Sequence, residues 1–242
     1  MGETRDSGSE IGTGLDLDID VVVFDVLGTL VDEPGGLRAA IREAAPASDD
    51  AAVDELLALW RRHGEQEQER VRQGLRPYAG TGVLDAEAAR RVADEAGVTD
   101  PAAVARLATA GRRLSPWDDS VAGLERLARR FPVLGLSDAS RAALLRLNAH
   151  AGLRWHQALS AESVLAYKPA PEVYRLAVDC AGCPAERVLM VAAHAWDLRG
   201  AQAVGMRTAY VRRPAGDPPA ASDAFDGCFD GLDGLVAALT SR

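Results

Sequence analysis

The sequence has few cysteines, no excess of positive charge and no long apolar run. Three cysteines in 242 residues fit a reducing cytoplasm better than a disulfide framework. The net charge of -9 argues against nucleic acid and anionic membranes as partners. No apolar stretch approaches the length of a membrane span. The first ten residues, MGETRDSGSE, have no signal-peptide pattern, and residues 1–17 are expected to be a disordered tail.

The stretch from Val21 to Asp25, VVVFD, is the strongest strand pattern in the chain. A run of β-branched residues without alternation is typical of a strand buried on both faces, as in a parallel sheet. Asp25 then lies at the carboxyl end of that strand, where open α/β sheets bind ligands. The alternative is an aspartate that caps a helix, but Gly28 and Leu30 do not continue an amphipathic helix.

Residues 34–113 are rich in Ala, Arg and Glu and have no strand pattern. Apolar residues recur at helical spacing around Leu37–Ile41 and Val53–Trp60, and again over 86–96 and 101–113. This region predicts an inserted helical cap domain of about four helices.

From Pro132 onward, strand and helix patterns alternate, which predicts an α/β fold with a doubly wound parallel sheet. The core domain is expected over residues 18–33 and 114–242. The expected strands are 132–137, 157–160, 188–193, 208–211 and a short one near 229, and the expected helices are 141–151, 171–181, 195–204 and 232–239.

Three motifs carry a family resemblance: D-V-L-G-T-L from Asp25, K-P-x-P-x-x-Y from Lys168, and A-W-D ending at Asp197. They resemble the haloacid dehalogenase superfamily, and most of all the hydrolytic (S)-2-haloacid dehalogenases. The resemblance spans nearly the whole chain after residue 18 and implies a Rossmann-like core with a small helical cap.

Two positions separate this chain from the phosphatase branch of that superfamily. Phosphatases carry a second aspartate two residues after the first, where this chain has Leu27. A phosphate ester leaves as an alkoxide that needs a proton, whereas a halide leaves as a stable anion. The magnesium-dependent relatives also carry an acid at the position of Ala193. No metal and no organic cofactor are therefore expected.

The resemblance implies a catalytic set. Asp25 is the nucleophile, Thr29 hydrogen-bonds its carboxylate, and Lys168 keeps that carboxylate ionised. Asp197 positions the hydrolytic water, with His194 as a candidate base because it follows a buried strand beside an acid. Thr29 has an alternative role as a turn residue, and His194 one as a loop histidine bonded to a backbone carbonyl.

The resemblance also implies a substrate-binding set. Ser137 and backbone N–H groups after Asp25, around Leu27, hold the substrate carboxylate, and Arg61 stabilises charge from the cap. The alternative for Arg61 is an exposed residue of a charged helix. Asp138, Trp196 and Tyr174 complete this set. Tyr174 has three possible roles: a wall of the pocket, a hydrogen-bond partner behind the site, or a residue that only packs in its helix.

Asp138 is the largest departure from the family pattern, which has an asparagine that helps to cradle the leaving halide. An ionised aspartate has no hydrogen-bond donor. Its carboxylate has three alternatives: it caps the helix beginning near Ser140, it is protonated, or it is paired with Arg61, Arg62 or Lys168.

The predicted function is displacement of halide from short 2-haloalkanoic acids through an aspartyl ester, giving 2-hydroxy acids with inversion. The expected partners are a small carboxylate substrate, halide and a second copy of the chain. The alternative is a hydrolase or binding protein for another small acid or a phosphate ester, without dehalogenase activity.

Overall fold

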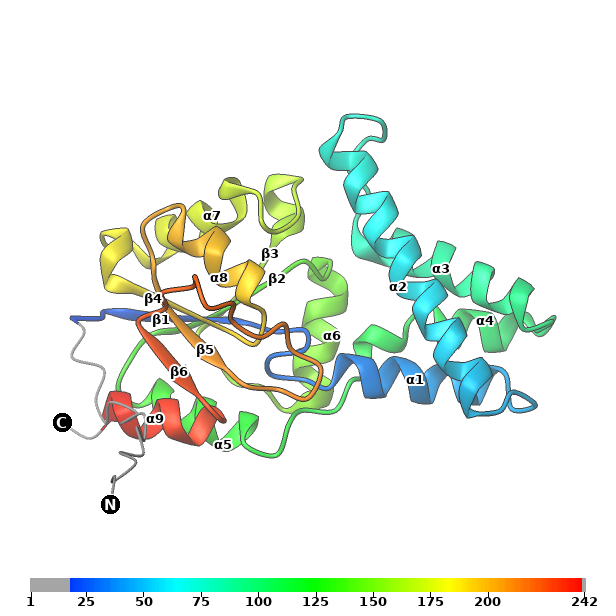
Figure 1. The fold of residues 1–242 in the computed structure, drawn as a ribbon, viewed down its shortest axis with the longest axis horizontal. Coiled ribbons are helices and arrows are strands. Elements are labelled where there is room, and N and C mark those ends of the chain that lie inside the picture. The colour runs from blue at the N-terminus through cyan, green and yellow to red at the C-terminus, as the bar shows by residue number, and fades with distance from the viewer. Residues whose placement is uncertain (1–17, 241–242) are drawn as a thin grey trace, which may run out of the picture.

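The computed structural model describes residues 18–240, so the predicted tail at residues 1–17 lies outside the described part. Figure 1 shows a twisted sheet flanked by helices, with a second group of helices beside it. The strands are β1 (Val21–Asp25), β2 (Val133–Ser137), β3 (Gln157–Ser160), β4 (Val188–Ala192), β5 (Arg207–Val211) and β6 (Gly227–Phe229).

The strands are paired in parallel, in the order β3-β2-β1-β4-β5-β6. β1 lies at the centre between β2 and β4, and the strand order reverses on either side of it. In doubly wound sheets this reversal opens a crevice at the carboxyl ends of the central strands. The predicted α/β fold class is confirmed, and Asp25 ends the central strand.

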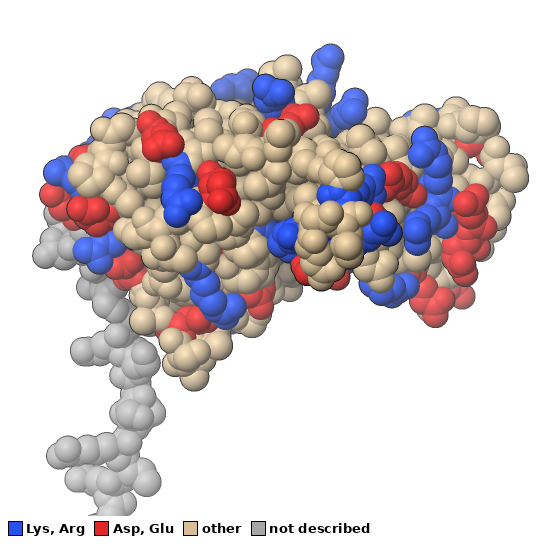
Figure 2. Space-filling model, turned by 90° about the horizontal axis from the view of Figure 1, so that it is seen from above, with Lys and Arg blue, Asp and Glu red and all other residues tan. Residues whose placement is uncertain are grey.

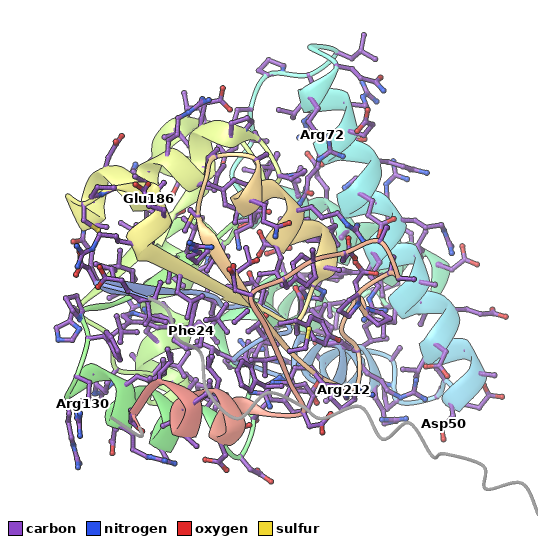
Figure 3. All side chains as sticks on the ribbon, turned by 60° about the vertical axis from the view of Figure 1, so that its left-hand side comes forward. Phe24, Asp50, Arg72, Arg130, Glu186 and Arg212 are labelled. Carbon is purple, nitrogen blue, oxygen red and sulfur yellow. The ribbon has the colours of Figure 1, made fainter. Side chains whose placement is uncertain are left out.

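Each face of the sheet is covered by its own helices. Val22 and Phe24 point into a cluster with helices α5, α6 and α9, whereas Val21 and Val23 pack toward α7 and α8. Phe24 therefore lies deep in the interior in Figure 3. These helices are α5 (Ser120–Ala128), α6 (Arg141–Ala151), α7 (Pro171–Ala181), α8 (Ala195–Gln202) and α9 (Leu232–Thr240).

Residues 34–113 are largely helical, as their apolar spacing predicts, and have a hydrophobic cluster of their own. The four α-helices outside the sheet layers are α1 (Glu33–Ala44), α2 (Asp50–Arg72), α3 (Thr81–Glu95) and α4 (Pro101–Leu107). The side chains of Asp49 and Asp100 accept hydrogen bonds from the first turns of α2 and α4, which fixes where both helices begin. Figure 3 labels Asp50 and Arg72 at the two ends of α2.

Two details differ from the sequence-based expectation. Helix α5 was not predicted, although its buried Leu124 and Leu127 have helical spacing. The helix expected over residues 101–113 ends at Leu107, and a short 3-10 helix, η1 (Ala110–Arg112), follows it.

Side chains of both signs are interspersed on the face shown in Figure 2. Exposed side chains form ion pairs at several places in the described residues, such as Arg106 with Glu43 and Arg126 with Asp233. Exposed pairs of this kind contribute little to stability. Within residues 18–240, no helix combines the length and the apolar character that a bilayer crossing requires.

Candidate active site

The polar side chains that the sequence singled out converge at the carboxyl ends of the central strands. Asp25 ends β1 and Ser137 ends β2, while Lys168 reaches in from the loop before α7. Asp197 lies in the first turn of α8, directly beyond β4. The exposed fractions of Asp25, Lys168 and Asp197 are only 6%, 3% and 0%. Burial this deep requires each charged group to have a partner.

Asp25 is held at both carboxylate oxygens. The Lys168 ammonium donates to Oδ1 over 2.8 Å, and the Thr29 hydroxyl donates to Oδ2 over 2.6 Å. Thr29 is itself fixed, because its hydroxyl oxygen accepts from the backbone N–H of Ala193 at 2.9 Å. The predicted contacts of Thr29 and Lys168 with Asp25 are therefore confirmed, and they orient and hold the carboxylate.

The turn after β1 is fixed from outside the sheet. Gly28 has a φ of 78°, a conformation that glycine adopts without strain. A Cβ at Gly28 would lie 2.7 Å from Nε2 of His194, so a larger residue would displace this histidine. The Gly28 carbonyl accepts from the indole N–H of Trp117, and the Thr29 carbonyl accepts from Nε of Arg213.

Asp197 lies behind Lys168 and does not line the cavity. Its Oδ2 accepts from the Lys168 ammonium at 2.8 Å, and its Oδ1 accepts from the Tyr174 hydroxyl at 2.6 Å. Asp197 thus anchors Lys168 through one oxygen and Tyr174 through the other, and its predicted role in positioning a water stays a prediction. Tyr174 is a hydrogen-bond partner behind the site and not a substrate contact, since it is fully buried and does not reach the cavity.

Opposing effects set the protonation of this centre. Burial disfavours the charged ammonium, but the adjacent Asp197 and Asp25 outweigh burial and raise the pKa of Lys168. Burial and the neighbouring Asp197 raise the pKa of Tyr174, so its hydroxyl stays neutral and donates. Lys168 is also the only lysine in the chain, since all other basic side chains apart from histidine are arginines.

A cavity of about 300 Å³ opens over Asp25, between the sheet edge and helices α1, α2 and α3. Its volume suits a small ligand. Eight of the predicted site residues line it: Asp25, Leu27, Arg61, Ser137, Asp138, Lys168, His194 and Trp196. Thr29, Tyr174 and Asp197 lie behind them and support the lining.

Asp138 lines the cavity beside Ser137. Its Oδ1 accepts from the backbone N–H of Lys168 at 3.0 Å. It does not cap the following helix, because the Ser140 side chain accepts from Ala143 N at the start of α6. Burial raises the pKa of Asp138 to about 7, although the nearby Lys168 charge acts in the opposite direction.

The indole and imidazole rings of Trp196 and His194 form one wall of the cavity. The two rings stack with centroids 5.8 Å apart and an angle of 24° between their planes. His194 precedes α8, and its ring lies over Gly28, close to the turn that follows the nucleophile. This placement keeps His194 as a candidate base for the hydrolytic water.

Three further carboxyl residues that were not predicted from the sequence line the cavity, and two of them, Glu33 and Asp85, have raised pKa values. Glu33 begins α1, and burial raises its pKa while His194 counteracts this effect. Asp85 lies on α3, and burial together with Glu33 raises its pKa to about 7. No motif marks either residue, because only the packing of α1 and α3 over the sheet edge brings them to the cavity.

Among residues 18–240, no cluster of three or more histidine, cysteine, aspartate or glutamate side chains has an arrangement that could hold a metal ion. At the position where a second acid would be expected, Ala193 has only a methyl group. Leu27, at the position where phosphatases have their second aspartate, contributes an apolar side chain to the cavity. The residues around Asp25 thus offer one cation, the Lys168 ammonium, in direct contact with the nucleophile.

Together, the fold and the site define a Rossmann-like α/β protein with a buried Asp–Lys–Asp centre beneath a helical layer. A family model described as a haloacid dehalogenase-like hydrolase matches residues 19–205. The chain belongs to this family, and the predicted resemblance is confirmed.

Individual relatives agree with this assignment. An (S)-2-haloacid dehalogenase of Pseudomonas putida is 30% identical over 199 residues, covering 81% of this chain and 86% of that protein. The crystal structure of an L-2-haloacid dehalogenase superposes with a TM-score of 0.84 at 31% identity, over 93% of this chain and all of that one (100%). A defluorinating L-2-haloacid dehalogenase gives a TM-score of 0.82 at 28% identity, covering 91% and 95% of the two chains.

Proposed function

We propose that this protein hydrolyses short 2-haloalkanoic acids to 2-hydroxy acids and halide. The observation that carries the proposal is Asp25, a carboxylate fixed by Lys168 and Thr29 at the floor of a cavity of about 300 Å³. A nucleophile needs to be oriented before the substrate arrives, and these contacts fix both oxygens of the carboxylate. The names of the relatives support the substrate class.

In the first step, an Asp25 oxygen attacks C2 of the substrate from the side opposite the halogen. The new C–O bond forms as the carbon–halogen bond breaks, and the halide leaves with the bonding electron pair. The product is an ester between Asp25 and the substrate, with inverted configuration at C2. No proton is required by the leaving group, which agrees with Leu27 in place of an acid.

In the second step, water attacks the Asp25 carboxyl carbon and releases the 2-hydroxy acid. The oxygen atom in the product hydroxyl therefore comes from Asp25, and the oxygen of water enters the Asp25 carboxylate. His194 is the candidate that takes the proton of this water, since it lines the cavity beside the turn after β1.

The remaining polar groups would bind the substrate. Ser137 is buried at the end of β2, and its oxygen accepts from Ala139 N at 3.1 Å, so its hydroxyl proton is available to a carboxylate. Arg61 faces the cavity from α2 and would stabilise negative charge from above. Leu27 and Trp196 add apolar surface on which a short carbon chain can lie.

We also propose that the protein acts as a homodimer in the cytoplasm. The dimer follows from the family resemblance. The compartment is supported by the three cysteines, all of which are free thiols.

A second candidate function is hydrolysis or binding of another small acid without halide release. The observation in its favour is the number of carboxyl groups around the cavity, which include Glu33, Asp85 and Asp138. Such a lining offers an anionic substrate fewer donors than an asparagine-containing pocket would.

A halide-release screen separates these functions. We expect halide from chloroacetate, bromoacetate and one enantiomer of 2-chloropropionate, with undiminished rate in excess EDTA, because Leu27 and Ala193 supply no metal ligand. Inorganic phosphate release from p-nitrophenyl phosphate serves as the comparison. Phosphate release that depends on Mg²⁺, or the absence of halide from every substrate including fluoroacetate, would contradict the proposal.

A further inference from the structure

Three carboxyl groups lie around Lys168: Asp25 and Asp138 in the cavity lining, and Asp197 behind it. Asp25 and Asp197 each contact the Lys168 side chain, and Asp138 contacts its backbone N–H. If all three carboxyls were ionised, this largely buried cluster would have a net charge of −2. Neighbouring carboxylates that share a site avoid this repulsion by retaining a proton on one of them.

The hydrogen bonds identify which carboxyl retains the proton. Both oxygens of Asp25 accept hydrogen bonds from side chains, and so do both oxygens of Asp197. A proton on Asp25 Oδ1 or Asp197 Oδ2 would face the Lys168 ammonium, which has donors only. A proton on the other oxygen of either residue would require the Thr29 or Tyr174 hydroxyl to reverse its hydrogen bond. Asp138 differs, because its Oδ1 accepts from Lys168 N while no donor within residues 18–240 is bonded to its Oδ2.

We propose that Asp138 acts in its neutral, protonated form and donates a hydrogen bond from Oδ2 to the anionic part of a substrate in the cavity. The inference rests on the proposed function and specifies how the pocket binds negative charge. A neutral carboxyl group has the same hydrogen-bonding pattern as an asparagine amide. Its Oδ1 accepts from the backbone N–H of Lys168, and its protonated Oδ2 donates. The proton remains on Asp138 throughout the reaction, and no bond to it breaks.

Asp138 loses its donor when it ionises. Its hydrogen bond to the substrate therefore forms at low pH and is lost as the pH rises. The pKa of Asp138 lies at about 7, raised by burial, which places this loss in an accessible range. A hydrogen-bond donor that points at the charge developing in the transition state raises the reaction rate by about 10²–10³-fold.

Several other titratable groups share this environment. Those whose charges act on Asp138, or are influenced by it, are Asp25 on β1, Lys168 and Tyr167 in the loop before α7, Tyr174 on α7, Asp197 on α8 and Tyr78 in the loop between α2 and α3. Around the rest of the cavity lie Glu33, Arg61, Glu65, Asp85 and His194. The pKa of Asp85 is also about 7, so a variant of Asp85 is needed as a control.

The first test is the pH dependence of halide release between pH 6 and 9. Above pH 7 we expect the wild-type rate to fall by up to about tenfold per pH unit, reaching a loss of about 10²-fold by pH 9. The Asp138→Asn variant should keep its rate across this range, because its amide donates at every pH. Asp85→Asn should retain the wild-type fall. A flat wild-type profile, or a parallel fall in Asp138→Asn, would overturn the proposal.

A second readout does not depend on activity. Because Lys168 is the only lysine, protein labelled with [ζ-¹⁵N]lysine gives a single side-chain signal from the centre of the cluster. We expect this signal to shift with a midpoint near pH 7 in the wild type, and to lack this transition in Asp138→Asn. If no substrate releases halide, the proposed function fails, and this signal alone decides whether Asp138 holds the proton.

Anion binding shows which part of the substrate receives the hydrogen bond. Sodium bromide stands for the leaving halide, and sodium propionate stands for the substrate carboxylate. Affinity for bromide that falls above pH 7 in the wild type but not in Asp138→Asn assigns the donor to the halide. The same behaviour with propionate assigns it to the carboxylate, and pH-independent binding of both anions would overturn the donor role.

Discussion

Replacing Asp25 with asparagine is expected to lower halide release by about 10⁴-fold or more while the fold is retained. An amide oxygen is a far weaker nucleophile than a carboxylate and cannot form the ester intermediate in useful time. Halide release by freshly purified protein measures the effect, and circular dichroism checks the fold. Mass spectrometry of Asp25→Asn verifies that the amide has not reverted to the acid.

Asp32→Asn provides a matched control in the same segment. The Asp32 side chain accepts from Gly35 N and caps α1, a role that asparagine fills as well as aspartate does. We expect this variant to stay within about twofold of the wild-type rate, because neither stability nor the cavity changes appreciably. Activity of Asp25→Asn comparable with that of Asp32→Asn would exclude Asp25 as the nucleophile.

The second large effect is expected for Lys168→Met, both on activity and on stability. Removing the ammonium leaves Asp25 and Asp197 buried and facing each other without a counter-charge. Loss of one partner from a buried ion pair typically costs about 3–5 kcal/mol of unfolding free energy. Halide release should fall by at least about 10²–10³-fold, since the nucleophile loses its positioning cation. Urea unfolding and halide release measure the two effects.

Two further variants test whether the stability lost in Lys168→Met comes from the buried ion pairs or from the loss of any positive charge. Arg62→Met removes one positive charge from an exposed position on α2 and should change the unfolding free energy by less than about 0.5 kcal/mol. Lys168→Met combined with Asp197→Asn should regain part of the lost stability, because one uncompensated buried charge is removed, and should remain inactive. An unfolding free energy for Lys168→Met equal to that of Arg62→Met would show that the buried pair contributes no stability.

The strand ends could be predicted from the sequence because local patterns determine them. Val21–Asp25 is apolar until its last residue, and such a run has one favourable environment, the interior of a parallel sheet. Once β1 and β2 are parallel neighbours, Asp25 and Ser137 must meet at one edge. Lys168 was found through its motif, since no local pattern shows that a loop 143 residues from Asp25 reaches this edge.

The depth of each side chain could not be predicted, because it depends on packing between distant segments. Tyr174 reaches Asp197 through space that Gly200 leaves open, where a Cβ would lie 2.5 Å from the tyrosine hydroxyl. Asp197 was therefore expected in the cavity and lies behind it. Glu33 and Asp85 were missed for a related reason, since their helices bring them over the sheet edge only in the folded protein.

The central claim is that Asp25 forms the covalent bond to the substrate, and a single turnover in ¹⁸O-labelled water tests it most directly. With enzyme in excess over 2-chloropropionate, the oxygen in the product hydroxyl comes from Asp25 and the oxygen of water enters the carboxylate. We predict unlabelled 2-hydroxypropionate, and one ¹⁸O atom in the peptide that contains Asp25. Labelled product with an unlabelled Asp25 peptide would mean direct attack by water and would contradict the mechanism.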